Sequence, residues 1–168
     1  MKKPIFILGS ARSEGKTSEV LEKIVGGYSA EIVDLNKLNI SPYDYEHKNK
    51  EDDYIPLMRR VLEHDIMVLA TPVYWYSVST IMKIFIDRIT DLITIEKGLG
   101  RRLRGKKLFV ITTYSTSKPQ GFEYPIEQFC NYLGIEYLGC SYICSNDPSP
   151  LSSNNNSEID KAKKILFA

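Results

Sequence analysis

The sequence predicts an α/β protein with a doubly wound, five-stranded parallel sheet in the order 2-1-3-4-5 and helices on both faces. Short apolar runs alternate with amphipathic stretches from end to end, as strands buried on both faces alternate with covering helices. Neither a repeat nor a linker-like stretch interrupts this alternation. Residues 1–168 are therefore expected to form a single domain.

Five apolar runs are predicted to be the strands. Each run is short, largely apolar and followed by turn or helix-start signals. In chain order they are Pro4–Gly9, Glu31–Leu35, Ile66–Thr71, Lys107–Thr113 and Glu136–Cys144.

The helices are predicted from apolar residues at helical spacing, as at Val20, Leu21 and Ile24. A capping-box pattern at Ser157 and Asp160 predicts where the last helix begins. The predicted helices are Lys16–Gly26, Tyr54–Glu63, Thr80–Ile93, Phe122–Leu133 and a short last helix ending at Phe167.

Composition excludes several classes of function. A net charge of +1 gives no strong field for nucleic acid or an anionic membrane, and neither is expected as a partner. No window approaches the roughly 18 apolar residues of a membrane span. Cys140 and Cys144 share a strand face about 13 Å apart, too far for a disulfide, so reduced thiols and a cytoplasmic location are expected.

The segment after the first strand has the chemistry of a phosphate site. It joins a strand to a helix N-terminus, where free N–H groups and the helix dipole favour an anion. Hydroxyl groups and the positive charges of Arg12 and Lys16 add to this preference. A serine-rich capping turn without a ligand is the alternative.

A nucleotide P-loop is a second alternative, because Gly15-Lys16-Thr17 resembles the end of G-x-x-x-x-G-K-[ST]. The spacing argues against it, since the first glycine of that pattern would have to be at Ser10. In addition, no apolar strand ends in the aspartate that helps to hold magnesium in such enzymes.

Three consecutive aromatic residues, Tyr74, Trp75 and Tyr76, follow the third strand. They cannot all point into one core, so at least one is expected to be exposed unless a ligand or another subunit covers it. A flat isoalloxazine ring needs an apolar wall and nearby backbone groups, which this loop after Pro72 could supply. Core packing or a subunit interface is the alternative.

Together the two loops resemble the NADPH-dependent FMN reductase family, and more closely its flavodoxin-like branch related to the iron–sulfur flavoproteins. The residues that resemble it are Gly9-Ser10-x-Arg12-x-x-Gly15-x-Thr17, Thr71 to Ser79, Met82-Lys83 and Asp87-Arg88. The resemblance implies a flavodoxin-like fold, bound FMN, electrons from NADPH or NADH, and homodimers or homotetramers.

Site residues follow from the resemblance at matching positions. The FMN phosphate would lie against the loop after the first strand, and Lys16 is added there for its charge and position. The ring would lie between the loops after strands three and four. The expected cofactor-binding residues are Ser10, Arg12, Gly15, Lys16, Thr17, Ser18, Pro72, Val73, Tyr74, Trp75, Tyr76, Thr113, Tyr114 and Ser115.

The segment from Asn36 to Asp53 departs from the iron–sulfur flavoproteins, which have a cysteine cluster there. It contains no cysteine, so no iron–sulfur centre and no other metal site is expected. It is long for a plain connection, which favours a cover or a partner surface. Tyr43, Tyr45 and His47 could meet a substrate there, although surface packing is the commoner role of such residues.

These observations favour an FMN-dependent NAD(P)H oxidoreductase that passes electrons to a quinone, flavin, azo compound or similar small molecule. No catalytic side chain is needed, because the flavin N5 accepts the hydride. A flavodoxin-type carrier reduced by a partner protein and a flavin-free interaction domain are the alternatives. The basic run from Arg101 to Lys107 is interpreted as a solvated turn, or else as an anion or subunit contact.

Overall fold

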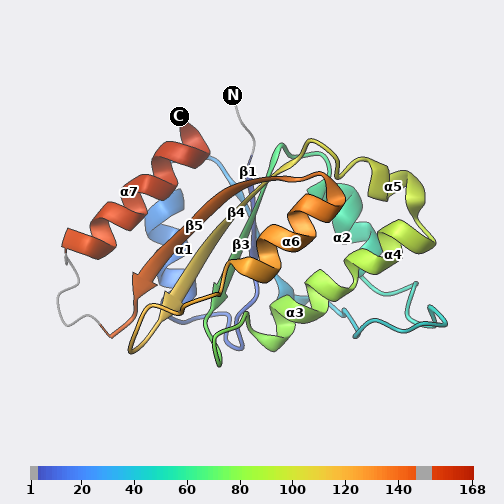
Figure 1. The fold of residues 1–168 in the computed structure, drawn as a ribbon, viewed down its shortest axis with the longest axis horizontal. Coiled ribbons are helices and arrows are strands. Elements are labelled where there is room, and N and C mark those ends of the chain that lie inside the picture. The colour runs from blue at the N-terminus through green and yellow to red at the C-terminus, as the bar shows by residue number, and fades with distance from the viewer. Residues whose placement is uncertain (1–3, 147–152) are drawn as a thin grey trace.

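The sheet has the predicted architecture. The computed structural model describes residues 4–146 and 153–168 (Figure 1). Five strands pair in parallel in the order β2-β1-β3-β4-β5, which confirms the predicted fold class. The strands are β1 (Pro4–Leu8), β2 (Glu31–Asp34), β3 (Ile66–Pro72), β4 (Lys107–Tyr114) and β5 (Glu136–Cys144).

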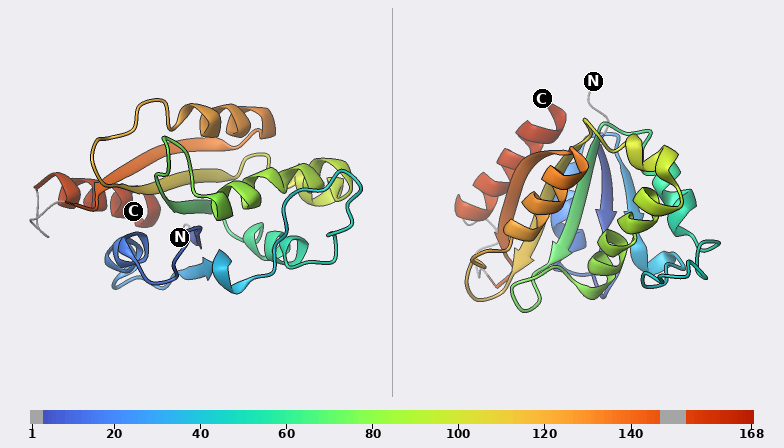
Figure 2. Two further views of the ribbon diagram at one scale, coloured as in Figure 1. Left: turned by 90° about the horizontal axis from the view of Figure 1, so that it is seen from below. Right: turned by 45° about the vertical axis from the view of Figure 1, so that its right-hand side comes forward.

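Helices cover both faces of the sheet (Figures 1 and 2). One face packs against α1 (Lys16–Val25) and α7 (Ser153–Phe167). The other packs against the remaining helices, which follow β2, β3 and β4 along the chain. These are α2 (Tyr54–Val61), α3 (Thr80–Asp87), α4 (Ile89–Thr94), α5 (Lys97–Arg101) and α6 (Tyr124–Leu133).

The alternation of side chains along β1 explains why its sequence is apolar at every position. Ile5 and Ile7 belong to the core under α2, α3 and α6, whereas Phe6 and Leu8 belong to the core under α1 and α7. Successive side chains of a strand point to opposite faces, so a strand with two covered faces has no position for a polar residue.

Four details differ from the sequence-based prediction. The predicted helix Thr80–Ile93 is interrupted at Arg88, which ends α3 and precedes α4. Helix α5 and a short 3₁₀ turn, η1 (Leu35–Lys37), were not predicted. The predicted capping box at Ser157 is wrong, because α7 begins four residues earlier, at Ser153.

The three cysteines are free, as expected. Cys130 and Cys140 are buried, and burial raises the pKa of the Cys130 thiol to about 12. Such thiols stay protonated and unreactive at neutral pH.

None of the helices in the described ranges has the length and apolar character needed to cross a membrane.

Candidate functional site

The loops that follow β1, β3 and β4 meet at the carboxyl edge of the sheet. The Gly9 N–H donates to the Ala70 carbonyl at 2.9 Å, and the Val73 N–H donates to the Thr113 carbonyl at 2.8 Å. Gly9 lies so close to α3 that an added Cβ would be 2.8 Å from the Met82 Cβ. The three loops are thus held at fixed positions beside one another.

A buried hydroxyl pair joins the first turn of α1 to the end of β4. The Oγ1 atoms of Thr17 and Thr113 are 2.8 Å apart, and both residues are almost completely buried. Two residues that the sequence assigned to different loops therefore touch, although they lie 96 positions apart in the chain.

The loop after β1 is held by its carbonyl groups. The Asn36 side chain donates to the Ser10 carbonyl at 2.5 Å, and the Ser79 hydroxyl donates to the Gly9 carbonyl at 2.6 Å. Both donors lie outside the loop, and they satisfy the hydrogen-bonding capacity of its two carbonyls. The first N–H groups of α1 have no carbonyl a turn earlier within the helix, which leaves them available to an anion. Asn36 and Ser79 were not identified as site residues from the sequence.

The charged and hydroxyl side chains of this loop differ in their availability. Arg12 is exposed and has no hydrogen bond or ion pair from its guanidinium to other described residues. Lys16 pairs with Glu19 at 3.0 Å. The Ser18 hydroxyl accepts from the Gly15 N–H at 2.9 Å and donates to the Gly15 carbonyl at 2.8 Å, so it already caps α1.

The aromatic loop after β3 is a tight two-residue hairpin. Tyr74 and Ser77 exchange backbone hydrogen bonds of 2.9 and 3.0 Å. Trp75 and Tyr76, between them, have φ angles of 48° and 63°, which makes the turn type I′. Left-handed backbone is rare and costly for bulky residues, so two in succession are strained. Trp75 is 95% exposed, which confirms that the aromatic run does not fill the core.

A cavity of about 380 Å³ lies between this hairpin and the loop after β4. Its size is within the range of small-molecule sites. Five expected cofactor-binding residues contribute to its wall. The lining residues are Val73, Trp75, Tyr76, Tyr114, Ser115, Thr116, Ser117 and Pro119.

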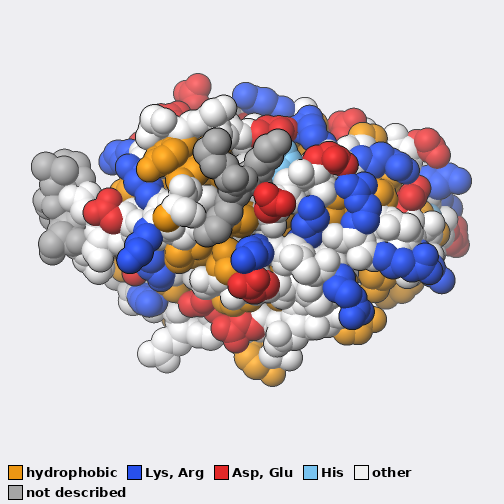
Figure 3. All heavy atoms as spheres, turned by 90° about the horizontal axis from the view of Figure 1, so that it is seen from above, with side chains coloured by type: hydrophobic (Ala, Val, Ile, Leu, Met, Phe, Trp, Pro, Cys, Tyr) orange, Lys and Arg blue, Asp and Glu red, His pale blue; other side chains and the backbone are white. Residues whose placement is uncertain are grey.

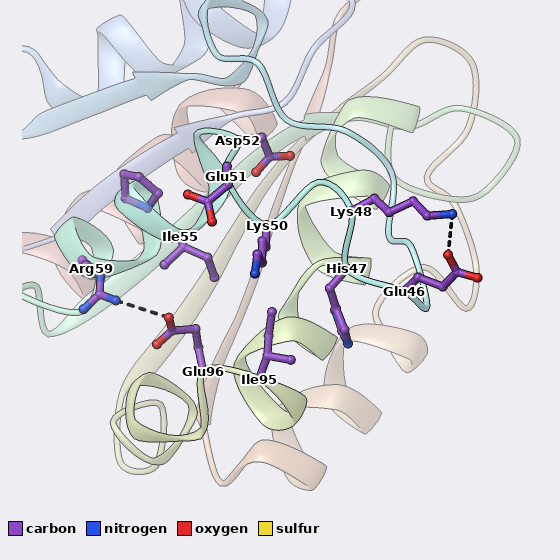
Figure 4. Close-up of a pocket in the computed structure, with 11 residues that line it drawn as sticks. Glu46, His47, Lys48, Lys50, Glu51, Asp52, Ile55, Arg59, Ile95 and Glu96 are labelled. Atoms are coloured by element: carbon purple, nitrogen blue, oxygen red, sulfur yellow. Dashed lines mark hydrogen bonds and ion pairs between the residues drawn. The ribbon is translucent and has the colours of Figure 1, made fainter.

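A second, larger cavity of about 820 Å³ lies under the segment from Asn36 to Asp53 (Figure 4). His47 and Lys50 from this segment, Arg59 from α2 and Glu96 before α5 line it, and Arg59 pairs with Glu96 at 3.4 Å. The walls contain charges of both signs. That Tyr43, Tyr45 or His47 meets a substrate stays a prediction.

Arg88 holds this segment against the body of the protein, a role that the sequence did not reveal. Its guanidinium is fully buried, donates to both carboxylate oxygens of Asp52 at 2.5 and 3.1 Å, and donates to Asp91 at 2.6 Å. Asp91 also bonds the ring of His47 at 2.9 Å. The sequence placed Arg88 within the predicted helix Thr80–Ile93, and its partners Asp52 and Asp91 were not identified.

The sheet order and the three loops that meet at the carboxyl ends of the strands define a doubly wound α/β protein. A family model described as "Flavodoxin-like fold" matches residues 2–166. The chain therefore belongs to this flavodoxin-like family.

Three relatives illustrate the similarity. The "Putative NAD(P)H-dependent FMN-containing oxidoreductase YwqN" of Bacillus subtilis is 40% identical over 95% of this chain and 94% of its own length. An "Iron-sulfur flavoprotein" of Archaeoglobus fulgidus is 30% identical over 70% of this chain and 57% of its own length. The solved structure of the Trp repressor binding protein from Bacillus subtilis covers 99% of this chain and 98% of its own, with a TM-score of 0.74 and 24% identity.

Proposed function

We propose that this chain is an FMN-dependent NAD(P)H oxidoreductase that transfers electrons to a small-molecule acceptor of the quinone, flavin or azo type. The observation that supports this most strongly is the cavity between the Tyr74–Ser77 hairpin and the loop after β4, beside the N-terminus of α1. The similarity to the FMN-containing oxidoreductase of Bacillus subtilis supports the same proposal.

The loop after β1 fits the phosphate of FMN. Its Gly9 and Ser10 carbonyls are engaged from outside by Ser79 and Asn36, while the amides at the start of α1 remain for an anion. Arg12 is free to add a charge-assisted bond to a phosphate oxygen. Ser18 would contribute through its backbone N–H, because its hydroxyl caps Gly15.

The cavity fits a flat ring. Trp75 and Tyr76 offer apolar surfaces on one side, and Tyr114 and Ser115 lie on the other. Ring binding would cover aromatic surface that is otherwise exposed to water, and this burial is favourable. The strain at Trp75 and Tyr76 is consistent with a turn shaped for a ligand, since strain of this kind clusters at functional sites.

The residues of this chain would bind and orient FMN, and the cofactor would supply the two-electron chemistry between nicotinamide and acceptor. In the described residues no group of three or more His, Cys, Asp or Glu is arranged to hold a metal ion. The role that we assign to the chain is to position FMN through the Thr17–Thr113 contact and the hairpin backbone.

We further propose a homodimer or homotetramer in the cytoplasm. Trp75 is 95% exposed at the rim of the cavity, where a second subunit or the bound flavin could cover it. Free thiols at all three cysteines suit a reducing compartment.

A flavodoxin-type electron carrier is the second candidate, because the flavodoxin-like fold is compatible with a carrier as well as with an enzyme. Carriers that dock with protein partners benefit from a strong electrostatic field. A net charge of +1 does not provide one, so the enzyme is favoured.

The proposal is tested by adding FMN to flavin-free protein and following flavin absorbance and fluorescence. Saturable binding of one FMN per chain is expected. The Thr113→Val variant keeps the shape of the residue but loses its contact with the Thr17 hydroxyl, and it should bind FMN more weakly. If the unmodified protein did not bind FMN, this result would contradict the proposed function.

A further inference from the structure

The basic residues from α5 to the start of β4 divide into two groups with different roles. Arg102 pairs with Glu63 at 2.7 Å, and Lys107 pairs with Glu136 at 3.2 Å. Lys106 donates to two backbone carbonyls just after α2, at 2.8 and 2.7 Å. These three cations are used to fasten the turn to its neighbours.

The second group of cations does not fasten the turn to its neighbours. Arg101, Arg104 and the preceding Lys97 are exposed, and their side chains make no hydrogen bond or ion pair with any residue in the described ranges. All three line one groove of about 290 Å³ between α4, α5 and α6. The other lining residues are Leu92, Ile93, Gly100, Tyr132 and Leu133.

The groove is built on rigid contacts. Gly100 lies so close to α4 that an added Cβ would be 2.2 Å from the Leu92 carbonyl oxygen, so a side chain there would separate the two helices. The aliphatic stem of Arg104 lies against Gly134, where an added Cβ would be 3.2 Å from its Cγ. The Gly105 N–H donates to the Gly134 carbonyl at 2.8 Å and fixes the turn beside the end of α6.

The three cations follow one another at spacings of four and three residues, which brings like charges onto one side of α5 and the turn after it. Seen from above, Lys and Arg side chains lie among Asp and Glu side chains on the side of the molecule where α5 lies (Figure 3). An anion in the groove would relieve this repulsion. Leu92 and Leu133 give the groove an apolar floor, and Tyr132, 78% exposed, gives it an aromatic wall.

We propose that this groove binds a small organic polyanion, of the class of nucleoside diphosphates. Its phosphates would lie on Arg101, Arg104 and Lys97, because guanidinium groups bind phosphate oxygens in pairs. Its ring would lie against Tyr132 and the apolar floor. This pairing of charge with an aromatic wall distinguishes the expected ligand from inorganic phosphate alone.

The groove is separate from the proposed FMN site, and the inference does not depend on that proposal. Leu133 and Arg104 precede β5 and β4, so the groove lies at the amino edge of the sheet. The cavity for the ring lies at the carboxyl edge, after β4, whose eight residues span about 26 Å. A ligand in the groove would therefore bind without displacing one at the other edge.

Calorimetric titration of the protein with ADP, pyrophosphate and adenosine, in the absence and in the presence of FMN, tests the proposal. ADP is expected to bind most tightly, pyrophosphate more weakly, and adenosine weakest. The double variant Arg101→Glu/Arg104→Glu should lose at least about tenfold in affinity for ADP and pyrophosphate. The matched control Lys23→Glu/Lys164→Glu changes net charge equally at exposed sites on α1 and α7, which cover the other face of the sheet, and should leave both affinities unchanged.

Several results would overturn the proposal. These are absence of ADP binding, equal binding of adenosine and ADP, or affinities unaffected by the Arg101 and Arg104 changes. A shift in subunit number in the double variant, without any ADP binding to the unmodified protein, would instead identify the groove as a subunit contact. If the double Glu variant does not fold, Arg101→Gln/Arg104→Gln gives the same comparison without charge reversal.

Discussion

Arg88 shows how one buried charge fixes a whole segment. Its guanidinium has no exposed surface, bonds Asp52 and Asp91, and lies 4.8 Å from the centre of the Tyr54 ring. Buried charges are stable only when they are paired and hydrogen-bonded. The segment from Asn36 to Asp53 therefore depends on this residue for its attachment.

Replacing Arg88 with Met should lower the free energy of unfolding by about 3–5 kcal/mol, because it leaves two buried carboxylates without their partner. Urea unfolding measures the loss. Arg59→Met is the control, since its pair with Glu96 is at the surface and worth at most about 1 kcal/mol. Equal losses in the two variants would contradict the role of Arg88.

Asp52 predicts how stability changes with acid. Burial alone would raise the pKa of its carboxyl group, but hydrogen bonds from Arg88 and from the backbone of Ser41 and Tyr54 outweigh burial and lower the pKa. Because the folded value lies below the unfolded one, the stabilisation is complete above the unfolded pKa of about 3.9 and is lost as the pH falls through the folded value. The free energy of unfolding should fall more steeply below about pH 4 in the unmodified protein than in Asp52→Asn. Parallel pH profiles would count against this linkage.

Arg12→Ala should weaken FMN binding by about 1.5–3 kcal/mol, because it removes a charge-assisted bond to the phosphate. Fluorescence titration with FMN measures the change, and riboflavin, which has no phosphate, should bind both proteins equally. Lys164→Ala, an exposed cation on α7, is the control and should not alter FMN affinity. Unchanged FMN affinity in Arg12→Ala would show that the phosphate binds elsewhere.

At the scale of elements, the Tyr74–Ser77 hairpin combines strain with exposure. Trp75 and Tyr76 adopt backbone angles that Asn and Gly adopt readily, and their side chains are 95% and 65% exposed. Little packing would be lost on replacing them in the flavin-free protein. The sequence at this turn is thus better suited to a ligand than to stability.

The double variant Trp75→Asn/Tyr76→Gly should raise the free energy of unfolding of the flavin-free protein by about 1 kcal/mol or more, because it removes strain at two positions. It should at the same time weaken FMN binding, because it removes the aromatic wall. Chemical unfolding without FMN and titration with FMN measure the two effects. A variant that binds FMN as tightly as the unmodified protein would show that the hairpin does not line the ring.

The strands could be predicted closely because their burial on two faces leaves a continuous apolar pattern, as along β1 and β3. An apolar pattern does not show where a helix is interrupted beside a contact with a residue distant in the sequence. Arg88, at the break between α3 and α4, bonds Asp52, which lies 36 residues away, and α5 is a five-residue helix with two glycines. Neither feature leaves an apolar pattern that a local window could detect.

For the candidate site, the sequence identified residues that the structure brings together, such as Thr17 with Thr113 and Trp75 with Tyr114. It could do so because the carboxyl ends of parallel strands meet at one edge. It could not identify Asn36 and Ser79, because their role is to bond backbone carbonyls of another loop. Their pairing depends on the packing of α3 and η1 against that loop.

At the scale of the whole molecule, the charges nearly cancel, and the two proposed ligand sites lie at opposite edges of one rigid sheet. A nearly neutral surface is suited to small-molecule partners that diffuse into a cavity without strong steering. The central claim is therefore that a nicotinamide cofactor transfers electrons directly to bound FMN, without a partner protein. A carrier would instead need a protein that reduces it.

The most direct test is to mix FMN-loaded protein with NADPH, and separately with NADH, in the absence of oxygen and to follow the visible absorbance of the flavin. We expect at least one of the two to bleach the bound flavin without any added protein, and an added quinone to restore the colour. Flavin that stays oxidised with both cofactors, but is reduced by a partner protein at a rate that depends on salt, would contradict the enzyme and identify an electron carrier.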